Sequence, residues 1–465
     1  MIIKNTIKGD VMKINIYSTD ANSNRLTLTD TDYMEYKNTD TVEEQGHPND
    51  VESCIINIYK QIEYQTYGGI GGAFTDTSAN VWMNMPDDKK EEFIKAYFDR
   101  KNGIGYTLGR LSIASCDFST EDYTYVKEGD ASLDSFDISH DKQSVFPLIQ
   151  EAQKYAELTL FASPWSPPAY MKTTNSRIGG HLKKDCYALW AKYFRKYVLA
   201  CKENNVNIWA VTVQNEPRHH QIWESCIYTA DEEAEFLEYL HNELNDKNVK
   251  ILCYDHCRER VFERAEQILN SKNKDYCDGV AHHWYSGDHF GGLKAFSHKY
   301  PDKINIASEG CCIVNGKGIK PELDLKFAET YAHDIIGCFN NGVNYYCDWN
   351  LLLNQDNGPH HNREARAVSA EAPVYYLENE NKLIYRLSYY YIGHISKFVT
   401  PGAKVVATSS YCSDLETVAF KNTDGTIVCI ILNRTEEIFS PIIRLEQHIK
   451  QITIIPHSIT TVKIV

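Results

Sequence analysis

Apolar residues along the chain follow three different spacings in three consecutive regions. In residues 1–66, short stretches such as INIYSTD and CIINIYK alternate apolar and polar positions, as strands with one buried face do. In residues 67–385, continuous apolar runs alternate with longer segments of helical period. In residues 386–465, β-like alternation returns in LETVAFKN, GTIVCIILNR and SITTVKIV. The pattern predicts a central α/β domain flanked by β segments.

The central region repeats strand and helix many times. Its buried-strand candidates are GYTLGRLSIAS, LTLFASPW, IWAVTVQNE, VKILCYDH, GVAHHWY, INIASEG and NYYCDWN. Helical stretches such as DDKKEEFIKAYF, ADEEAEFLEYLHNEL and ELDLKFAETYAHDIIGCFN lie between them. Alternation of this kind predicts a parallel sheet, and about eight repeats predict a closed (β/α)8 barrel.

The β segments at the two ends are expected to meet in one small β domain. Asp424 and Gly425 stand between two strand-like runs, which predicts a hairpin. The predicted domain organisation is 1–66 and 386–465 for the β domain and 67–385 for the barrel. Local pattern leaves open which strands pair.

Several barrel strands end abruptly in polar, aromatic or ionisable residues. In a (β/α)8 barrel these strand ends lie at one face, where active sites form. The residues in question are Arg110, Trp165, Asn215, Glu216, His283, Tyr285, Glu309 and Trp349. They are therefore expected to converge on one mouth.

Two of these residues, Glu216 and Glu309, suit glycoside hydrolysis, in which one carboxyl group protonates the leaving oxygen and another attacks the sugar or activates water. Asn215 is placed to hold a neighbouring sugar hydroxyl. Tyr285 and Arg110 are placed to keep a carboxylate ionised. We expect Glu216 and Glu309 to be catalytic.

Charge and composition exclude some classes of partner. The formal net charge is −15 and no basic run is present, which disfavours nucleic acid and anionic membrane surfaces. The first thirty residues lack a signal-peptide core, and no apolar run is long enough to span a membrane. The fourteen cysteines are scattered, as free thiols are in a reducing compartment. We expect a cytoplasmic protein, with Met12 as an alternative start.

No metal or cofactor is expected. Histidine and cysteine gather at Cys253, His256 and Cys257, at His219 and His220, at His282 and His283, and at His360 and His361. None of these groups has a second pair at zinc-ligand spacing, and adjacent strand residues face opposite sides. The glycine cluster YGGIGGAFTD does not fit a dinucleotide fingerprint, and a close backbone approach in a tight turn explains it better.

The motifs together resemble glycoside hydrolase family 30, which includes glucosylceramidases, β-glucosidases, β-xylosidases and β-1,6-glucanases. The resemblance rests on GGAFTDTSA, GRLSIASCDFSTEDYTY, ASPWSPPAYMKT, WAVTVQNEP, VAHHWY, ASEGC, DWNLLLN and YYYIGHISKFVTPGAKVV, in the family's order. It implies a (β/α)8 TIM barrel with a β-sandwich side domain built from both termini.

The resemblance also implies roles for individual residues. Glu216 matches the family's acid/base and Glu309 its nucleophile. Asp76, Trp165, Asn215 and Trp349 match positions that contact the sugar. Arg110, His283 and Tyr285 match residues that support the nucleophile and shape the pocket.

Substrate choice stays open because two loops depart from the family pattern. These are the stretch RHHQIWESC after Glu216 and the loop over 354–375, where His360, His361 or Arg363 could line the pocket. We expect a retaining, exo-acting enzyme on small carbohydrate substrates, with glucose ahead of xylose and fucose. The alternatives are an endo-β-1,6-glucanase, a glucosylceramidase, a metal-dependent hydrolase or a catalytically silent carbohydrate-binding barrel. The sequence gives no indication of the oligomeric state.

Overall fold

The computed structural model describes residues 12–36, 54–316, 318–361 and 368–465. The chain divides into two compact units. One unit comprises Gly69–Glu322 and Asn341–Arg386, and the other comprises Met1–Gly68, Leu323–Asn340 and Leu387–Val465.

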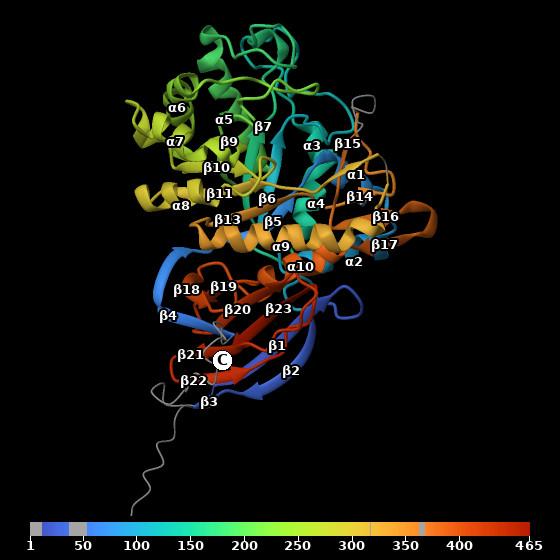
Figure 1. Cartoon of the computed structure of the whole chain (residues 1–465). Helices are drawn as coiled ribbons and strands as arrows, with labels where there is room; N and C mark the ends of the chain where they lie inside the picture. Colours follow the sequence, from blue (N-terminus) through green and yellow to red (C-terminus); the bar gives the residue numbers. More distant parts are fainter. Residues whose placement is uncertain (1–11, 37–53, 317, 362–367) are drawn as a thin grey trace, which may run out of the picture. The chain divides into compact units, whose positions relative to one another are not determined.

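The first unit is built on a closed barrel of eight strands (Figure 1). All neighbouring strands of the barrel run parallel. In chain order the strands are β5 (Gly69–Ala73), β6 (Leu108–Ile113), β7 (Thr159–Pro164), β8 (Ile208–Thr212), β9 (Lys250–Cys257), β10 (Gly279–His283), β11 (Ile304–Glu309) and β13 (Tyr345–Asn350). The predicted (β/α)8 barrel is therefore confirmed.

Helices connect the barrel strands. They are α1 (Asp76–Asn84), α2 (Asp87–Phe98), α3 (Ser139–Gln143), α4 (Val145–Ala152), α5 (Tyr187–Glu203), α6 (Ala230–Leu244), α7 (Val261–Leu269) and α8 (Phe290–Lys299). Short strands β12 (Ile313–Asn315), β14 (Leu353–Asn354), β15 (Val368–Ala370), β16 (Val374–Leu377) and β17 (Lys382–Tyr385) form two small sheets after β11 and β13.

The barrel interior is filled by apolar side chains from its strands, so it is a packed core. One buried layer consists of Leu108, Phe161, Ala210, Leu252, Ala281, Ile306 and Cys347. The glycine cluster lies within strand β5, and not in the tight turn expected from the sequence. A Cβ atom on Gly71 would lie only 1.6 Å from the carbonyl oxygen of Leu108, so this contact of β5 with β6 requires glycine.

The second unit contains a ten-stranded sheet that joins strands from both ends of the chain. Its order is β2-β1-β23-β20-β19-β18-β4-β21-β22-β3. The strands are β1 (Lys13–Asp20), β2 (Thr27–Tyr33), β3 (Glu35–Tyr36), β4 (Ile55–Thr66), β18 (Lys404–Ser410), β19 (Leu415–Lys421), β20 (Ile427–Asn433), β21 (Ile442–Leu445), β22 (His448–Gln451) and β23 (Ser458–Ile464). The first and last of these, β1 and β23, pair antiparallel with Ile14 opposite Ile464.

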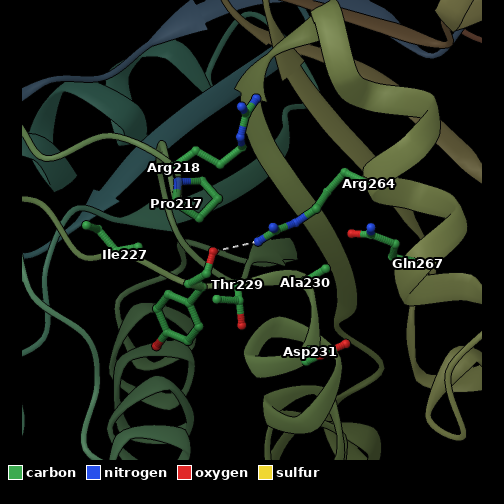
Figure 2. Close-up of a pocket in the computed structure, with 9 residues that line it drawn as sticks. Pro217, Arg218, Ile227, Thr229, Ala230, Asp231, Arg264 and Gln267 are labelled. Carbon is green, nitrogen blue, oxygen red and sulfur yellow. Dashed lines mark hydrogen bonds between the residues drawn. The ribbon is translucent and has the colours of Figure 1, made fainter.

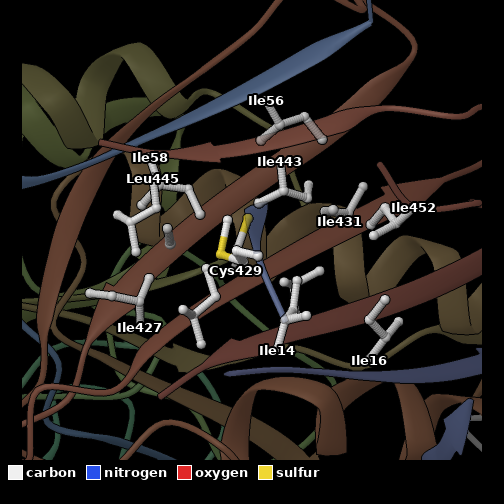
Figure 3. Close-up of a cluster of buried hydrophobic side chains, with 14 of the residues drawn as sticks. Ile14, Ile16, Ile56, Ile58, Ile427, Cys429, Ile431, Ile443, Leu445 and Ile452 are labelled. Carbon is white, nitrogen blue, oxygen red and sulfur yellow. The ribbon is translucent and has the colours of Figure 1, made fainter. Parts of the chain in front are cut away.

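Alternating positions of these strands supply one apolar core (Figure 3). Ile14 and Ile16 of β1 lie in the same cluster as Cys429 and Ile431 of β20. The predicted hairpin joins β19 and β20, with Gly425 at a φ of +88°. The hairpin expected at Asp424 and Gly425 is therefore confirmed.

Two helices accompany this sheet, α9 (Asp324–Asn340) and α10 (Leu387–Ser396). The sequence assigned the helical stretch of α9 to the barrel domain, whereas the contacts group it with the ten-stranded sheet. His333 of α9 lies 2.6 Å from Glu416 of β19, which joins the helix to the sheet. The predicted domain limits differ from the compact units mainly in residues 323–340, and as domain limits they stay a prediction.

Candidate active site

Glu309 is the last residue of strand β11, and two side chains hold its carboxylate. Nη1 of Arg110 donates to Oε2 at 2.6 Å, and the hydroxyl of Tyr285 donates to Oε1 at 2.8 Å. Glu309 is 8% exposed, so most of its surface is covered by protein. A carboxylate fixed in this way is presented as an anion in a set orientation.

Arg110, on strand β6, is fully buried beneath the site. Besides Glu309 it donates to Asp255 at 2.8 Å and to the side-chain oxygen of Asn215 at 3.0 Å. Its guanidinium carbon also lies 5.0 Å from the ring of Trp165 and 5.6 Å from that of Trp349. Burial acts to lower the pKa of Arg110, but Asp255 and Glu309 raise it, so the guanidinium stays charged.

Asp255, on strand β9, balances that charge from below. Its Oδ1 lies 3.0 Å from Nε2 of His283 and accepts a 2.6 Å hydrogen bond from Ser308. Its Oδ2 accepts hydrogen bonds from Arg110 and from Thr212. Burial acts to raise the pKa of Asp255, but Arg110 and His283 outweigh burial and lower it. Asp255 is thus an anion that fixes two cationic side chains.

His283 connects the two glutamates. Its Nδ1 lies 3.6 Å from Oε1 of Glu216 and 3.8 Å from Oε1 of Glu309. Burial acts to lower the pKa of His283, but attraction to Glu309, Asp255 and Glu216 raises it to about 10. The imidazole is therefore protonated at neutral pH, and its Nδ1 atom lies within 4 Å of both carboxylates.

Glu216 follows strand β8 and has a left-handed backbone, with φ of +48°. Its amide donates to the carbonyl of Asp255 at 2.9 Å, and Nε2 of Gln221 donates to its Oε2 at 2.7 Å. Burial acts to raise the pKa of Glu216, but His283 and the contact with Gln221 lower it to about 2. The Glu216–His283 pair therefore holds one transferable proton, and at rest it lies on the imidazole.

Both glutamates face a single pocket of about 460 Å³. Its lining comprises Asp117, Phe118, Trp165, Asn215, Glu216, His219, Gln221, Ile222, Trp223, Cys257, Tyr285, Glu309, Cys311, Ile313, Trp349 and Ala370. Trp165 and Trp349 stack on each other with ring centroids 5.4 Å apart. Ile222 and Ile313 are 56% and 47% exposed, so the lining includes apolar groups open to solvent.

The structure brings together eight of the nine site residues expected from the sequence. Asn215 accepts from Arg110 through its side-chain oxygen, which leaves its NH2 group to donate to a bound molecule. Asp76 stands apart, since it neither lines the pocket nor shares one of the contacts described above. Its carboxylate accepts from the amide and hydroxyl of Thr120 and lies 3.0 Å from Nε2 of His140. The expected sugar contact of Asp76 stays a prediction.

Sequence reasoning missed Asp255 and Gln221. Asp255 lies inside the apolar run of β9, where the sequence does not distinguish it from a strand residue without a functional role. Tyr254 and Asp255 both have positive φ, at +76° and +45°. This irregularity turns Asp255 toward Arg110 and is visible only in three dimensions.

His360, His361 or Arg363 of the loop over 354–375 was expected to line the pocket. Among the described residues of this loop, it is Ala370 that does so. His361 instead contacts Glu224, with Nε2 3.3 Å from Oε1, and its Nδ1 lies 2.9 Å from the carbonyl oxygen of Ser119. Neither His360 nor His361 lines the pocket, and Arg363 lies outside the described residues.

A second hollow, of about 600 Å³, borders the chain just after Glu216 (Figure 2). Arg264 spans it and donates to the carbonyl of Tyr228 at 2.7 Å, drawn as a dashed line in Figure 2. The same guanidinium is paired at 2.8 Å with Glu233, which is fully buried and accepts from the amide of Tyr254. These contacts brace the irregular part of β9 that carries Asp255.

All fourteen cysteines are free thiols. Cys257 and Cys311 line the pocket, and Sγ of Cys311 lies 3.3 Å from the hydroxyl of Tyr285. Among the helices of the described residues, none combines the length and the apolar character needed to cross a membrane.

A closed (β/α)8 barrel with two glutamates facing one pocket at its strand ends is an arrangement typical of glycoside hydrolases. Comparison with known proteins agrees with this class. Residues 67–399 match the glycosyl hydrolase family 30 TIM-barrel domain, and residues 402–462 match the glycosyl hydrolase family 30 beta sandwich domain. The chain belongs to glycosyl hydrolase family 30.

Three similar proteins illustrate the range of this family. The lysosomal acid glucosylceramidase of Mus musculus is 31% identical over 411 residues, which cover 82% of this chain and 78% of that protein. The crystal structure of SrfJ from Salmonella typhimurium is 32% identical, with a TM-score of 0.89 over 97% of this chain and 99% of that one. A solved endo-β1,6-glucanase is 25% identical, with a TM-score of 0.84 over 97% and 99% of the two chains.

Proposed function

We propose that the protein is a retaining, exo-acting β-glycosidase that releases glucose, with xylose and fucose as the next candidates. The observation that carries this proposal is the position of His283 Nδ1, 3.6 Å from Glu216 and 3.8 Å from Glu309. Two carboxylates that share one nitrogen favour the close spacing of retaining enzymes, about 5–5.5 Å, over most of the inverting range of about 6.5–9.5 Å.

In the proposed mechanism Glu309 is the nucleophile. Arg110 and Tyr285 hold it as an oriented anion, and it attacks the anomeric carbon while the bond to the leaving oxygen breaks. Glu216 protonates that oxygen with the proton that the Glu216–His283 pair holds at rest. A covalent glycosyl-enzyme forms and the aglycone leaves as an alcohol.

In the second step Glu216 acts as a base. It takes a proton from a water molecule, whose oxygen attacks the anomeric carbon and releases Glu309. The proton returns to the Glu216–His283 pair, and the sugar leaves with its β configuration retained. Asn215, whose NH2 group is available at the pocket wall, is placed to bind the sugar hydroxyl next to the reacting carbon.

The lining of the pocket supports a small substrate with an apolar leaving group. A volume of about 460 Å³ is in the range of small-molecule sites and suits one sugar with part of its aglycone. The exposed side chains of Ile222 and Ile313 favour an alkyl or aryl aglycone. This observation favours a second candidate, a β-glucosidase for glycolipids, in line with the substrate that the name of the mouse relative gives.

The test is a panel of nitrophenyl β-glycosides with glucose, xylose, fucose and galactose, together with octyl β-glucoside and a β-1,6-linked glucan. Proton NMR of the first product follows the anomeric configuration. We expect the β-glucosides to be cleaved fastest, with β-glucose as the initial product. An α product would refute the retaining mechanism, and cleavage of the glucan alone would assign an endo-acting enzyme.

We also propose a cytoplasmic location, supported by the fourteen free thiols. Fractionation of the source cells, followed by detection of the protein with an antibody, tests this location.

A further inference from the structure

Glu216 has two histidine neighbours that the proposed reaction does not use. His219 follows it in the same loop, and His256 comes from strand β9. One ligand atom from each of Glu216, His219 and His256 lies within 4.8 Å of the other two. The rings of His219 and His256 meet edge to face, with centroids 4.5 Å apart. Together the three side chains form one cluster of donor atoms.

Backbone hydrogen bonds fix the positions from which the three side chains extend. The amide of Glu216 donates to the carbonyl of Asp255 at 2.9 Å, which ties the loop to the residue before His256. The amide of His219 donates to the carbonyl of Glu216 at 3.0 Å, closing a tight turn. The backbone positions from which the three donor side chains extend are therefore fixed.

His256 supplies an independent indication of a ligand. Its side chain is 1% exposed, and its Nδ1 atom is buried with no hydrogen-bond partner among the described residues. A buried polar atom without a hydrogen-bond partner is unfavourable unless a bound water or ligand interacts with it. The buried ring of His256, with a polar atom left unpartnered beside a second imidazole and a carboxylate, is suited to a metal ion.

The chemistry of the donors narrows the choice of ion. Two imidazoles and one carboxylate are the three protein ligands of many zinc sites, in which a fourth position stays open. Arg218 is adjacent to His219 in the sequence and carries a positive charge. Its guanidinium is paired with Glu259 at 2.8 Å, which reduces its repulsion of a cation. Nε2 of Gln221 lies 2.7 Å from Oε2 of Glu216 and 3.5 Å from Nδ1 of His219. The side chain of Gln221 must therefore move aside when an ion enters.

We propose that Glu216, His219 and His256 form a site for one zinc ion, and that zinc bound there reversibly inhibits the enzyme. The bound ion occupies the carboxylate oxygen that the leaving group needs, so Glu216 can neither give nor take a proton. The inhibition rests on the proposed function of Glu216, whereas the binding of zinc does not.

Isothermal titration calorimetry of the full-length protein with zinc chloride, after removal of metals with a chelator, tests the binding directly. We expect one equivalent to bind. His219→Ala and His256→Gln should each weaken binding about tenfold or more, since each removes one ligand. His219 is exposed, so the His219→Ala variant keeps the test valid if His256→Gln fails to fold.

Three further variants serve as controls. His220→Ala, in the same exposed turn, should leave the affinity unchanged. Cys54→Ser and Cys186→Ser each remove a partly exposed thiol that could capture zinc instead. Absence of saturable binding to the wild type would overturn the proposal. So would binding that both histidine variants retain, or binding that only a cysteine variant abolishes.

The activity measurement separates the two parts of the proposal. For each variant, the ratio of the rate with zinc to the rate without it is measured on the best substrate of the glycoside panel. We expect zinc to inhibit the wild type and to inhibit His219→Ala much less. Binding of one equivalent without loss of rate would refute the inhibitory role, while a protein that binds zinc but cleaves no glycoside would refute the proposed function alone.

Discussion

Arg110 and Asp255 form an ion pair of 2.8 Å in which neither side chain is exposed to solvent. Arg110 also donates a hydrogen bond to Glu309, and Asp255 also contacts the imidazole of His283. Opposite charges from four barrel strands thus hold one another beneath the pocket. Because every charge has a partner, the orientation of Glu309 depends on all four groups.

Asp255→Asn should therefore damage both stability and activity. It removes one of the two carboxylates that pair with the buried guanidinium of Arg110, and breaking a buried pair costs about 3–5 kcal/mol of unfolding free energy. Misplacement of Glu309 and His283 should reduce kcat by about 10²-fold. Urea unfolding and steady-state kinetics measure the two effects. Asp246→Asn, which removes an exposed partner of Arg195, is the control and should leave both values nearly unchanged.

The two proposed catalytic residues should respond differently to the leaving group. Glu216→Gln removes the proton donor and should lower kcat/KM about 10²–10⁴-fold for an alkyl β-glucoside. The loss should be much smaller for a dinitrophenyl β-glucoside, whose leaving group departs without a proton. Glu309→Gln should abolish turnover of both substrates. Equal losses on both substrates in Glu216→Gln would contradict the role of this residue as the acid.

The pH dependence of activity should follow the proton of the Glu216–His283 pair. The pKa of Glu216 is lowered to about 2 and that of His283 is raised to about 10, so the pair keeps its one proton between these values. This pair should therefore cause loss of kcat only as the pH rises toward 10. Asp255→Asn removes one of the anions that raise the pKa of His283, and its alkaline limb should move toward neutral pH. Brief assays from pH 6 to 10.5 measure both profiles.

The apolar side chains of the pocket lining should contribute to the binding of an aglycone. Ile222→Ser removes an exposed apolar side chain and should raise KM for octyl β-glucoside roughly fivefold, equivalent to about 1 kcal/mol. KM for methyl β-glucoside should stay the same, since its aglycone does not extend to Ile222. Ile438→Ser, at another exposed isoleucine, is the matched control. An equal rise in KM for both glucosides would place Ile222 at the sugar and not at the aglycone.

His394 of α10 should make the unit with the ten-stranded sheet sensitive to acid. Its ring is buried, with each nitrogen 2.8 Å from a threonine hydroxyl, Thr461 and Thr19. Burial lowers the pKa of His394 to about 3, below its value of about 6.5 in the unfolded chain. The stability that neutral His394 contributes is present above pH 6.5 and is lost as the pH falls toward 3. Thermal unfolding of His394→Gln should change less over this range than the wild type, and His298→Gln, at an exposed histidine, should behave like the wild type.

The fold class could be predicted because its signals are local. Seven of the eight barrel strands are apolar runs that end in polar residues, and the helices between have a clear period. The eighth strand, β5, is the glycine cluster, whose pattern indicated a turn. The assignment of α9 could not be predicted in this way, because a helix of the same pattern packs equally well on either sheet. The pairing of β1 with β23 joins residues more than four hundred positions apart and has no local signal.

The candidate site, like the fold, was predictable from the sequence only in part. Glu216 and Glu309 were found because each directly follows or ends an apolar run. Asp255 was missed because its direction depends on the left-handed backbone at residues 254 and 255. The approach of His219 to His256 was missed because the two residues belong to different strand ends, and their spacing in the sequence carries no information about it.

The left-handed backbone of Glu216 has a consequence for the evolution of this chain. A glutamate held at φ of +48° is strained, while glycine adopts this conformation without penalty. Glycine at this position would relieve about 1–3 kcal/mol of backbone strain, but it would remove the contacts with Gln221 and His283 and the proposed acid. At residue 216, backbone stability favours glycine and the proposed catalysis requires glutamate. The glutamate found there indicates that catalysis has been the stronger requirement.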